Sequence, residues 1–273
     1  MFISVRRIFG ECSAPACANY TVLVNAEEHR EEFPRAAASL ENNRYMDDTL
    51  ESVESKEEAA CLCKDLSEVM KRGFHLTKWA LNSPEVLAEI PKSDRAEVKE
   101  IGPQGSPAVR TLGVVYEPST DTLRIIAPTK KPAKTPREIL SFISSIWDPL
   151  GLVSPFVIRG RMFLQGLWPL KLDWDDVIDE EKLHEWSKFE SEANSLDELR
   201  FPRCYRRRKE AADDFQLHVF ADSSIQAKCA VAYYCFCYEN GEVDVSLVSS
   251  RVRVTPLREL PSQGLRWTRS GWS

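Results

Sequence analysis

The spacing of apolar residues predicts helices in the first third of the chain. From Ser55 to Arg72, apolar side chains recur every three or four positions, which is the period of a helix with one buried face. Ser55 and Glu58 form a capping box at its start, and Gly73 follows its end. We therefore expect a helix over Ser55–Arg72, then a short strand over Phe74–Trp79 and a short helix that opens at Ser83–Pro84.

The middle third combines a hairpin pattern with three helical patterns. Thr111–Tyr116 and Thr122–Ile126 are rich in β-branched residues and flank a turn-forming segment, which predicts a β-hairpin. A Lys- and Pro-rich linker follows. Three helices are then predicted. The first has a Thr135/Glu138 capping box and an apolar face of Ile139, Phe142, Ile143 and Ile146. The second starts at Ser154–Pro155 and is apolar through Trp168, and the third has the apolar stripe Leu183, Trp186 and Phe189. This part should form a small helical bundle.

The last third changes to a period of two, which is typical of strands. Phe215, Leu217 and Val219 alternate with polar residues, and Cys229–Tyr238 is a long β-rich run. Asn240–Gly241 is the strongest short hairpin signal in the chain, and it leads into a strand over Val243–Val248. The three thirds together indicate an α+β protein.

Composition narrows the class of protein and its compartment. The 273 residues carry a net charge of −6, without the overall basic field of a free-standing nucleic-acid-binding protein, so any such function must depend on local patches. No apolar run approaches the roughly 18–20 residues that cross a bilayer, and Met1–Arg7 is too short and polar for a secretory signal. We expect a protein of the cytoplasm or nucleus that is not secreted and has no membrane partner.

The eight cysteines give no sign of a metal site. They never form a Cys-x-x-Cys motif, and the four histidines lie far from them in the sequence, which argues against a zinc ribbon or finger. Without an export signal, we expect these thiols to be reduced.

The tetrapeptide Tyr45-Met46-Asp47-Asp48 is the most informative chemical motif. Two adjacent carboxylates on a tight turn between strands supply the hard oxygen ligands that a divalent cation needs for phosphoryl transfer. An isolated Asp-Asp pair is more often a solvated turn. The surrounding motifs favour the metal-binding alternative here.

These motifs occur in the order found in one family of mobile elements. They are Phe9-Gly10, Tyr45–Asp48, Leu112-Gly113, Thr135–Ser141, Asp148-Pro149-Leu150-Gly151-Leu152-Val153-Ser154-Pro155 and Leu172–Asp176. Together they resemble the pol polyprotein of BEL/Pao-type LTR retrotransposons, over nearly the whole chain. The Asp-Pro-Leu-Gly run is the most specific of them.

The resemblance implies a reverse-transcriptase palm in the first part of the chain. Asp47 would be the metal ligand and Asp48 its supporting neighbour, with Mg²⁺ as the cofactor. Phe9, Gly10, Tyr45 and Met46 would lie beside the incoming nucleotide. Lys78 and Trp79 would lie near the primer end, as a phosphate contact and a stacking platform; a buried tryptophan beside a solvated lysine is an equal alternative.

The resemblance also implies the start of a ribonuclease H domain. Val219–Ser224 resembles its first strand, which would make Asp222 a metal ligand for hydrolysis of the RNA in a hybrid; an aspartate that only caps the strand end is the alternative. Arg206, Arg207 and Arg208 could hold a template-primer duplex. Alternatively, they belong to a solvated linker balanced by Glu210, Asp213 and Asp214.

Two departures from the family pattern lower the expected activity. The resemblance calls for another aspartate upstream of Phe9-Gly10 and for a glutamate in a helix after Val252, and we expect this chain to lack both. It would then consist of a partial palm (residues 1–100), a hairpin and helical connection (101–200), and a linker with the first strands of a truncated ribonuclease H-like domain (201–273).

The expected function follows from that division. The ancestral activity would be RNA-directed DNA synthesis with RNA removal, and this chain would have little or no catalysis. Its partners would be an RNA/DNA template-primer and the missing polyprotein segments. A non-catalytic nucleic-acid-binding remnant is the first alternative. An aspartic peptidase is the second, but neither Asp-Thr-Gly nor Asp-Ser-Gly occurs in the sequence.

Overall fold

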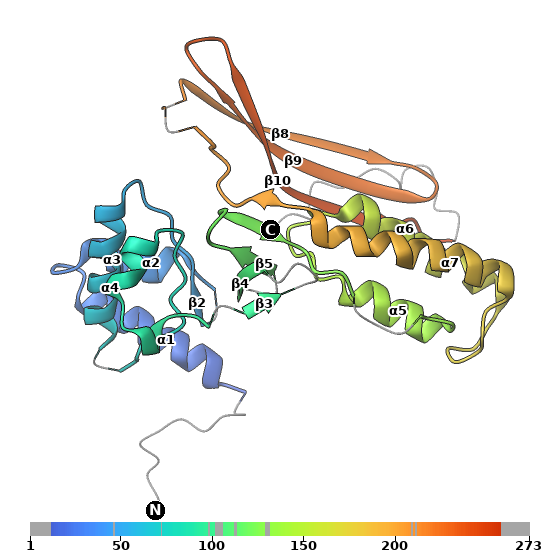
Figure 1. Cartoon of the computed structure of the whole chain (residues 1–273), viewed down its shortest axis with the longest axis horizontal. Helices are drawn as coiled ribbons and strands as arrows, with labels where there is room; N and C mark the ends of the chain where they lie inside the picture. The colour runs from blue at the N-terminus through green and yellow to red at the C-terminus, as the bar shows by residue number, and fades with distance from the viewer. Residues whose placement is uncertain are drawn as a thin grey trace, which may run out of the picture. The chain divides into compact units, whose positions relative to one another are not determined.

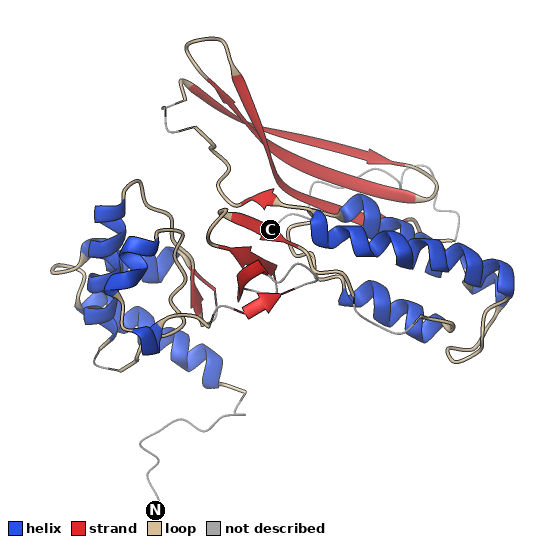
Figure 2. Ribbon diagram, viewed as in Figure 1, coloured by secondary structure: helices blue, strands red, loops and turns tan. Residues whose placement is uncertain are grey.

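The computed structural model describes residues 12–45, 47–71, 73–97, 99–101, 106–111, 114–128, 132–208, 210 and 212–257. The chain separates into two compact units, residues 1–99 and 100–273, which we call the N-terminal and C-terminal units (Figure 1). Helices and small antiparallel sheets alternate in the described residues, so the expected α+β character is confirmed (Figure 2). No helix in these ranges is long and apolar enough to span a membrane.

The N-terminal unit is a helical cluster with one small hairpin. Its elements are α1 (Ala14–Glu28), α2 (Pro34–Asn42), β1 (Arg44–Tyr45), β2 (Asp48–Thr49), α3 (Lys56–Met70), α4 (Pro84–Glu89) and a 3₁₀ turn, η1 (Lys92–Asp94). The predicted helices are confirmed as α3 and α4, and the Ser55 side chain caps α3 by accepting a hydrogen bond from the Glu58 N–H. Val22, Ala26, Leu40, Leu66 and Val69 form the centre of its core.

The strand predicted over Phe74–Trp79 is not formed. The segment makes a single isolated bridge, between Trp79 and Arg95, and Lys78 has a φ of 62°. A left-handed residue turns the backbone out of the extended conformation that a ladder requires. Phe74, Leu76 and Trp79 instead pack their side chains against the helical core.

A five-stranded sheet, whose first strand crosses the boundary between the units, begins the C-terminal unit. Its strands are β3 (Lys99–Ile101), β4 (Ser106–Thr111), β5 (Val114–Glu117), β6 (Thr122–Arg124) and β7 (Phe201–Pro202), in the order β3-β4-β5-β6-β7. The predicted hairpin is confirmed as β5 paired with β6. Strand β7, far away in sequence, pairs with the other side of β6.

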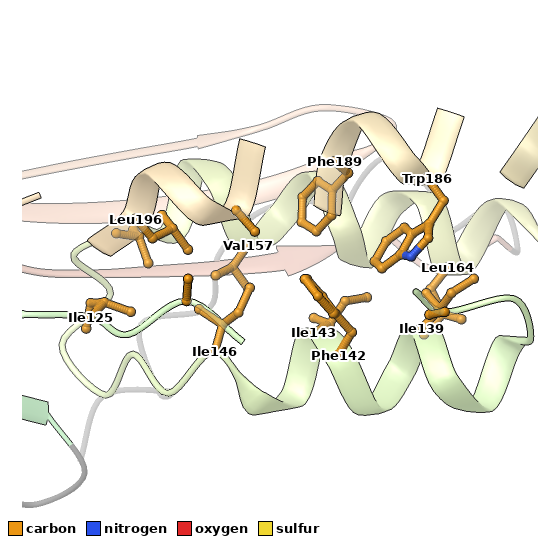
Figure 3. Close-up of a cluster of buried hydrophobic side chains, with 14 of the residues drawn as sticks. Ile125, Ile139, Phe142, Ile143, Ile146, Val157, Leu164, Trp186, Phe189 and Leu196 are labelled. Carbon is orange, nitrogen blue, oxygen red and sulfur yellow. The ribbon is translucent and has the colours of Figure 1, made fainter. Parts of the chain in front are cut away.

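Three helices form the predicted bundle. They are α5 (Pro136–Ser145), α6 (Ser154–Gly166) and α7 (Glu180–Ala193), with 3₁₀ turns η2 (Trp168–Leu170) and η3 (Asn194–Glu198). Thr135 and Glu138 form the expected capping box at the start of α5. Side chains from the three helices meet in one apolar core, in which Phe142 lies edge-on to Trp186 with ring centroids 5.5 Å apart (Figure 3).

The last strands form a separate three-stranded antiparallel meander. Strands β8 (Asp214–Ser223), β9 (Ala227–Cys237) and β10 (Val243–Val254) lie in the order β10-β9-β8 (Figure 2). Side chains of directly paired residues share a face. On β9, the face we call the alanine face carries Lys228, Ala230, Ala232, Tyr234 and Phe236, and the opposite cysteine face carries Cys229, Val231, Tyr233, Cys235 and Cys237.

The two edges of this meander differ. Helix α6 and the Asp148–Gly151 loop cover the outer edge of β10: the Ser250 N–H donates to the Leu150 carbonyl at 2.9 Å, and Gln165 Nε2 donates to the Thr255 carbonyl at 2.7 Å. Every residue of β8 is exposed. The meander is thus attached to the helical bundle through β10.

Candidate nucleic-acid interface

The described residues of the predicted metal-binding tetrapeptide belong to a short hairpin. Tyr45 in β1 pairs with Asp48 in β2, and Asp47 lies in the turn between them. Both aspartates are exposed, and so is Tyr45. The Arg44 side chain holds the hairpin against α1 through a 2.8 Å hydrogen bond from Nη2 to Asn19 Oδ1. The turn can therefore offer two carboxylates to solvent from a fixed position.

The described residues do not complete a magnesium site around these carboxylates. Within the described ranges, no group of three or more His, Cys, Asp or Glu side chains could hold a metal ion. Two-metal phosphoryl transfer needs several carboxylates around both ions. Asp47 and Asp48 alone do not fit that requirement. Phe9, Gly10 and Met46, the other residues predicted beside the nucleotide, lie outside the described residues.

Lys78 and Trp79 have different surroundings. Lys78 is exposed, whereas Trp79 is half-buried and packs against the helical core of the N-terminal unit. The backbone of Trp79 is fixed on both sides, since its N–H donates to the Asp94 carbonyl and its carbonyl accepts from the Ala96 N–H, each at 2.9 Å. Trp79 thus contributes to the helical core, and the Lys78 side chain faces solvent.

Asp222 lies near the end of β8, paired with Cys229 on the cysteine face. Its Oδ1 accepts a 2.8 Å hydrogen bond from the Ser223 N–H, and its side chain is exposed. Within the described part of the chain, Asp222 belongs to no group of three or more His, Cys, Asp or Glu side chains that could hold a metal ion. The described residues thus supply one candidate ligand at the predicted ribonuclease H position, and they do not by themselves fit a magnesium pair.

The arginine-rich segment binds mainly to the protein itself. Arg200 Nε lies 3.0 Å from Glu117 Oε2, and Arg203 Nε lies 2.7 Å from Asp121 Oδ1. Asp121 also accepts a hydrogen bond from the Tyr116 hydroxyl. Burial of Tyr116, together with this hydrogen bond, raises the pKa of Tyr116 to about 12. These pairs fasten the segment to the five-stranded sheet.

Of the three arginines predicted to contact nucleic acid, Arg206 and Arg208 follow the same trend. Arg208 pairs with Glu242 and with Asp244, and its guanidinium lies over the Tyr238 ring at 4.9 Å from the centroid. The bond to Glu242 raises the pKa of Arg208 and lowers that of the glutamate. Arg207 lines a cavity of about 100 Å³ beside β10, and Arg206 also has an interaction partner within the protein.

The carboxylates that pair with Arg208 differ from those named in the linker alternative. That alternative named Glu210, Asp213 and Asp214, whereas the partners of Arg208 come from the β9–β10 hairpin. They meet there because Asp214 in β8, Cys237 in β9 and Val243 in β10 form one end of the meander. Asp222 belongs to the opposite end. The structure does not bring Arg208 and Asp222 together.

The sequence-based prediction missed other cations of the meander. Lys228, Arg251 and Arg253 lie at the same end of the sheet as Asp222, on the alanine face. They are scattered along the sequence and become neighbours only through strand register. An Arg-x-Arg pattern within a β-rich run was the one local signal that could have indicated them.

Comparison with known proteins identifies one family. Residues 135–262 match the family model described as the Pao retrotransposon-like RNaseH-like domain. This range includes the three helices and the whole meander. No curated protein and no solved structure matches the chain. The match supports a Pao-type retrotransposon polyprotein as the source of this sequence, and an RNaseH-like domain suggests nucleic acid as a partner.

Proposed function

We propose that this chain is the part of a Pao-type retrotransposon polyprotein that binds an RNA/DNA hybrid through its C-terminal unit. The observation that carries the proposal is the three-stranded meander inside the matched range, with Asp222 exposed near the end of its first strand. Such a sheet end is open to a large ligand, because no residue of β8 is covered.

Catalysis requires more than the described carboxylates offer. Asp222 is a single candidate ligand, and hydrolysis of a phosphodiester by two metal ions needs further carboxylates to hold both ions. We therefore expect this chain to bind the hybrid without cutting it. Asp222 would be a positioning point for Mg²⁺ only where other carboxylates are supplied to it.

A binding and cleavage assay on the full chain tests the proposal. Fluorescence anisotropy with a labelled RNA/DNA hybrid should show saturable binding that weakens as salt rises, because phosphate contacts release counterions. Asp222→Asn should keep the affinity within about threefold, since the variant removes a charge that repels phosphate. Absence of hybrid binding at low salt would contradict the proposal, and RNA cleavage that disappears in Asp222→Asn would contradict the expected inactivity.

For the N-terminal unit we infer a reverse-transcriptase origin without polymerase activity. The Tyr45–Asp48 turn, with its two exposed carboxylates, supports a reverse-transcriptase palm origin for this unit. We expect no primer extension on an RNA template with Mg²⁺ or Mn²⁺. Nucleotide incorporation that is lost in Asp47→Ala, but kept in the control Asp65→Ala on α3, would instead show an assembled polymerase site.

A further inference from the structure

Two arginines of β10 and one lysine of β9 lie close together on the alanine face. Arg253 in β10 pairs directly with Lys228 in β9, and Arg251 pairs with Ala230. Arg251 therefore lies diagonally across from Lys228 on the same face. Both arginines are exposed, and the lysine is half-buried. Three positive charges thus share one small area of the sheet.

A fourth cation reaches this area from the helical bundle. Arg161 in α6 is exposed, and its Nη1 donates to the Val252 carbonyl at 3.3 Å. Val252 lies between Arg251 and Arg253 in the strand. The Arg161 guanidinium therefore lies at the outer edge of β10, beside the two arginines. We call Arg161, Lys228, Arg251 and Arg253 the basic cluster.

No carboxylate of the described residues forms an ion pair with any member of the basic cluster. The contrast with nearby cations is clear, since Arg159, two residues before Arg161, lies 2.6 Å from Glu192. The chain as a whole carries a net charge of −6, so acidic partners are not scarce. The cluster is thus a local exception in an acidic protein.

The arrangement does not help the sheet to fold. Like charges directly opposite each other on neighbouring strands destabilise an antiparallel pair, and Lys228 with Arg253 is such a pair. A bound anion would relieve this repulsion. The nearest carboxylate of β8, that of Asp222, lies on the cysteine face. An anion on the alanine face at this end would therefore meet only small side chains and cations.

We propose that the basic cluster holds the phosphate backbone of a nucleic-acid strand; the proposal rests on the hybrid-binding function above. Arg251 and Arg253 are two residues apart in an extended strand, which separates them by about 7 Å. That spacing is of the same order as the distance between successive phosphates of one strand. The cluster reads no bases, so it contributes affinity without sequence preference.

The test compares two triple variants of the full chain with equal net charge. K228Q/R251Q/R253Q removes three members of the basic cluster. The control R137Q/R159Q/K182Q removes three cations of the helical bundle that are paired with Asp175, Glu192 and Glu185. Affinity for a labelled RNA/DNA hybrid is measured by anisotropy over a range of salt concentrations, and folding of each variant is checked by circular dichroism.

The cluster variant should lose at least about tenfold in affinity near 0.1 M salt, and the slope of log K against log salt should fall by about 2 to 3. The control should keep the wild-type slope. R251K/R253K should also keep it, because lysine retains the charge. If the cluster variant does not fold, R161Q alone serves, with a slope lower by about 1 and R159Q as its control.

Three results would overturn the proposal. Equal slopes for the cluster variant and its control, with wild-type protein binding the hybrid, would reject the cluster and leave the hybrid-binding function intact. Failure of the wild-type protein to bind the hybrid at low salt would reject that function itself. The third result uses a poly-glutamate peptide. If the wild-type protein binds this peptide and the cluster variant does not, while both bind the hybrid equally, the cluster is a site for an acidic protein.

Discussion

Gly151 and Asp148 give the Asp-Pro-Leu-Gly run a structural role. The Asp148 carboxylate accepts hydrogen bonds from the N–H groups of Leu152 and Val153, each at 2.8 Å, and so shapes the loop before α6. Gly151 has a φ of 76°, and its carbonyl accepts a 2.6 Å hydrogen bond from Ser250 Oγ. The loop thus connects the helical bundle to β10.

Replacing Gly151 by alanine should weaken the contact between the helical bundle and β10. A Cβ at this position would stand 2.7 Å from the carbonyl carbon of Ser250, and the positive φ adds strain for any L side chain. Because the opposing atoms are backbone, no rotamer change relieves the clash. We expect a loss of about 2 to 4 kcal/mol in the free energy of unfolding, measured by urea titration.

Gly166 provides the matched control. It ends α6, has an ordinary φ, and nothing lies within 4 Å of a Cβ placed on it. Gly166→Ala should change stability by less than about 1 kcal/mol, in the stabilising direction, because alanine favours a helix. Similar losses in both variants would show that the contact with Ser250 is not what makes Gly151 necessary.

The residue-level predictions held where a local signal was sufficient. The Thr135/Glu138 capping box depends on four consecutive residues, and the structure contains both of its hydrogen bonds. The partners of Arg208 could not be predicted in this way, because Glu242 and Asp244 reach it across strands that are distant in sequence. Ion pairs follow register, and register follows from the whole sheet.

At the scale of the element, β8 is a strand without cover on either face. All ten of its residues are exposed, including Phe215, Leu217 and Val219 on the alanine face. An exposed apolar edge strand is a template for pairing with another chain. We expect concentration-dependent association of the wild-type protein, visible in sedimentation velocity.

Lysines on this strand should suppress that association. In L217K/V219K the charges repel a second edge, and since both side chains are more than half exposed, stability should change by less than about 1 kcal/mol. The control is Leu140→Lys, at an exposed leucine of α5. Association that persists in L217K/V219K, or that falls equally in the control, would show that β8 is not the contact.

Helices and strands were predicted correctly where a short stretch of sequence carried the whole signal. Helices α3, α5 and α7 have one apolar stripe and clear caps, and they were predicted. Helix α1 was missed because its apolar residues lie all around it: Val22 and Ala26 are buried, whereas Tyr20, Leu23 and Val24 are exposed. The expected strand before Trp79 failed at a single left-handed residue, which no periodicity shows.

At the scale of the whole molecule, two cores support two units. The C-terminal core is centred on Trp186, which is 1% exposed, and the N-terminal core on Val69, which is fully buried. Trp186→Ala should destabilise the C-terminal unit by about 3 to 5 kcal/mol through the cavity it leaves. Hydrogen exchange should then speed up in α5–α7 and stay unchanged in α3.

The reverse experiment is the control. Val69→Ala should speed up exchange in α3 and leave α5–α7 protected, because the two units have separate cores. Faster exchange in both units after either substitution would mean that they unfold as one body. Composition alone allowed one to three domains and gave no boundary, because separate cores form through contacts that composition does not record.

The bulge in β10 shows how one residue decides which side of a sheet a charge occupies. The register of β10 against β9 shifts between Leu247 and Ser249, so that Val248 has no partner. Before it, even-numbered residues share the alanine face; after it, odd-numbered ones do, and these include Arg251 and Arg253. If Val248 instead paired in regular register, Arg251 would stand opposite Cys229, and both arginines would lie on the side of Asp222. For this strand, the number of residues counts as much as their identity.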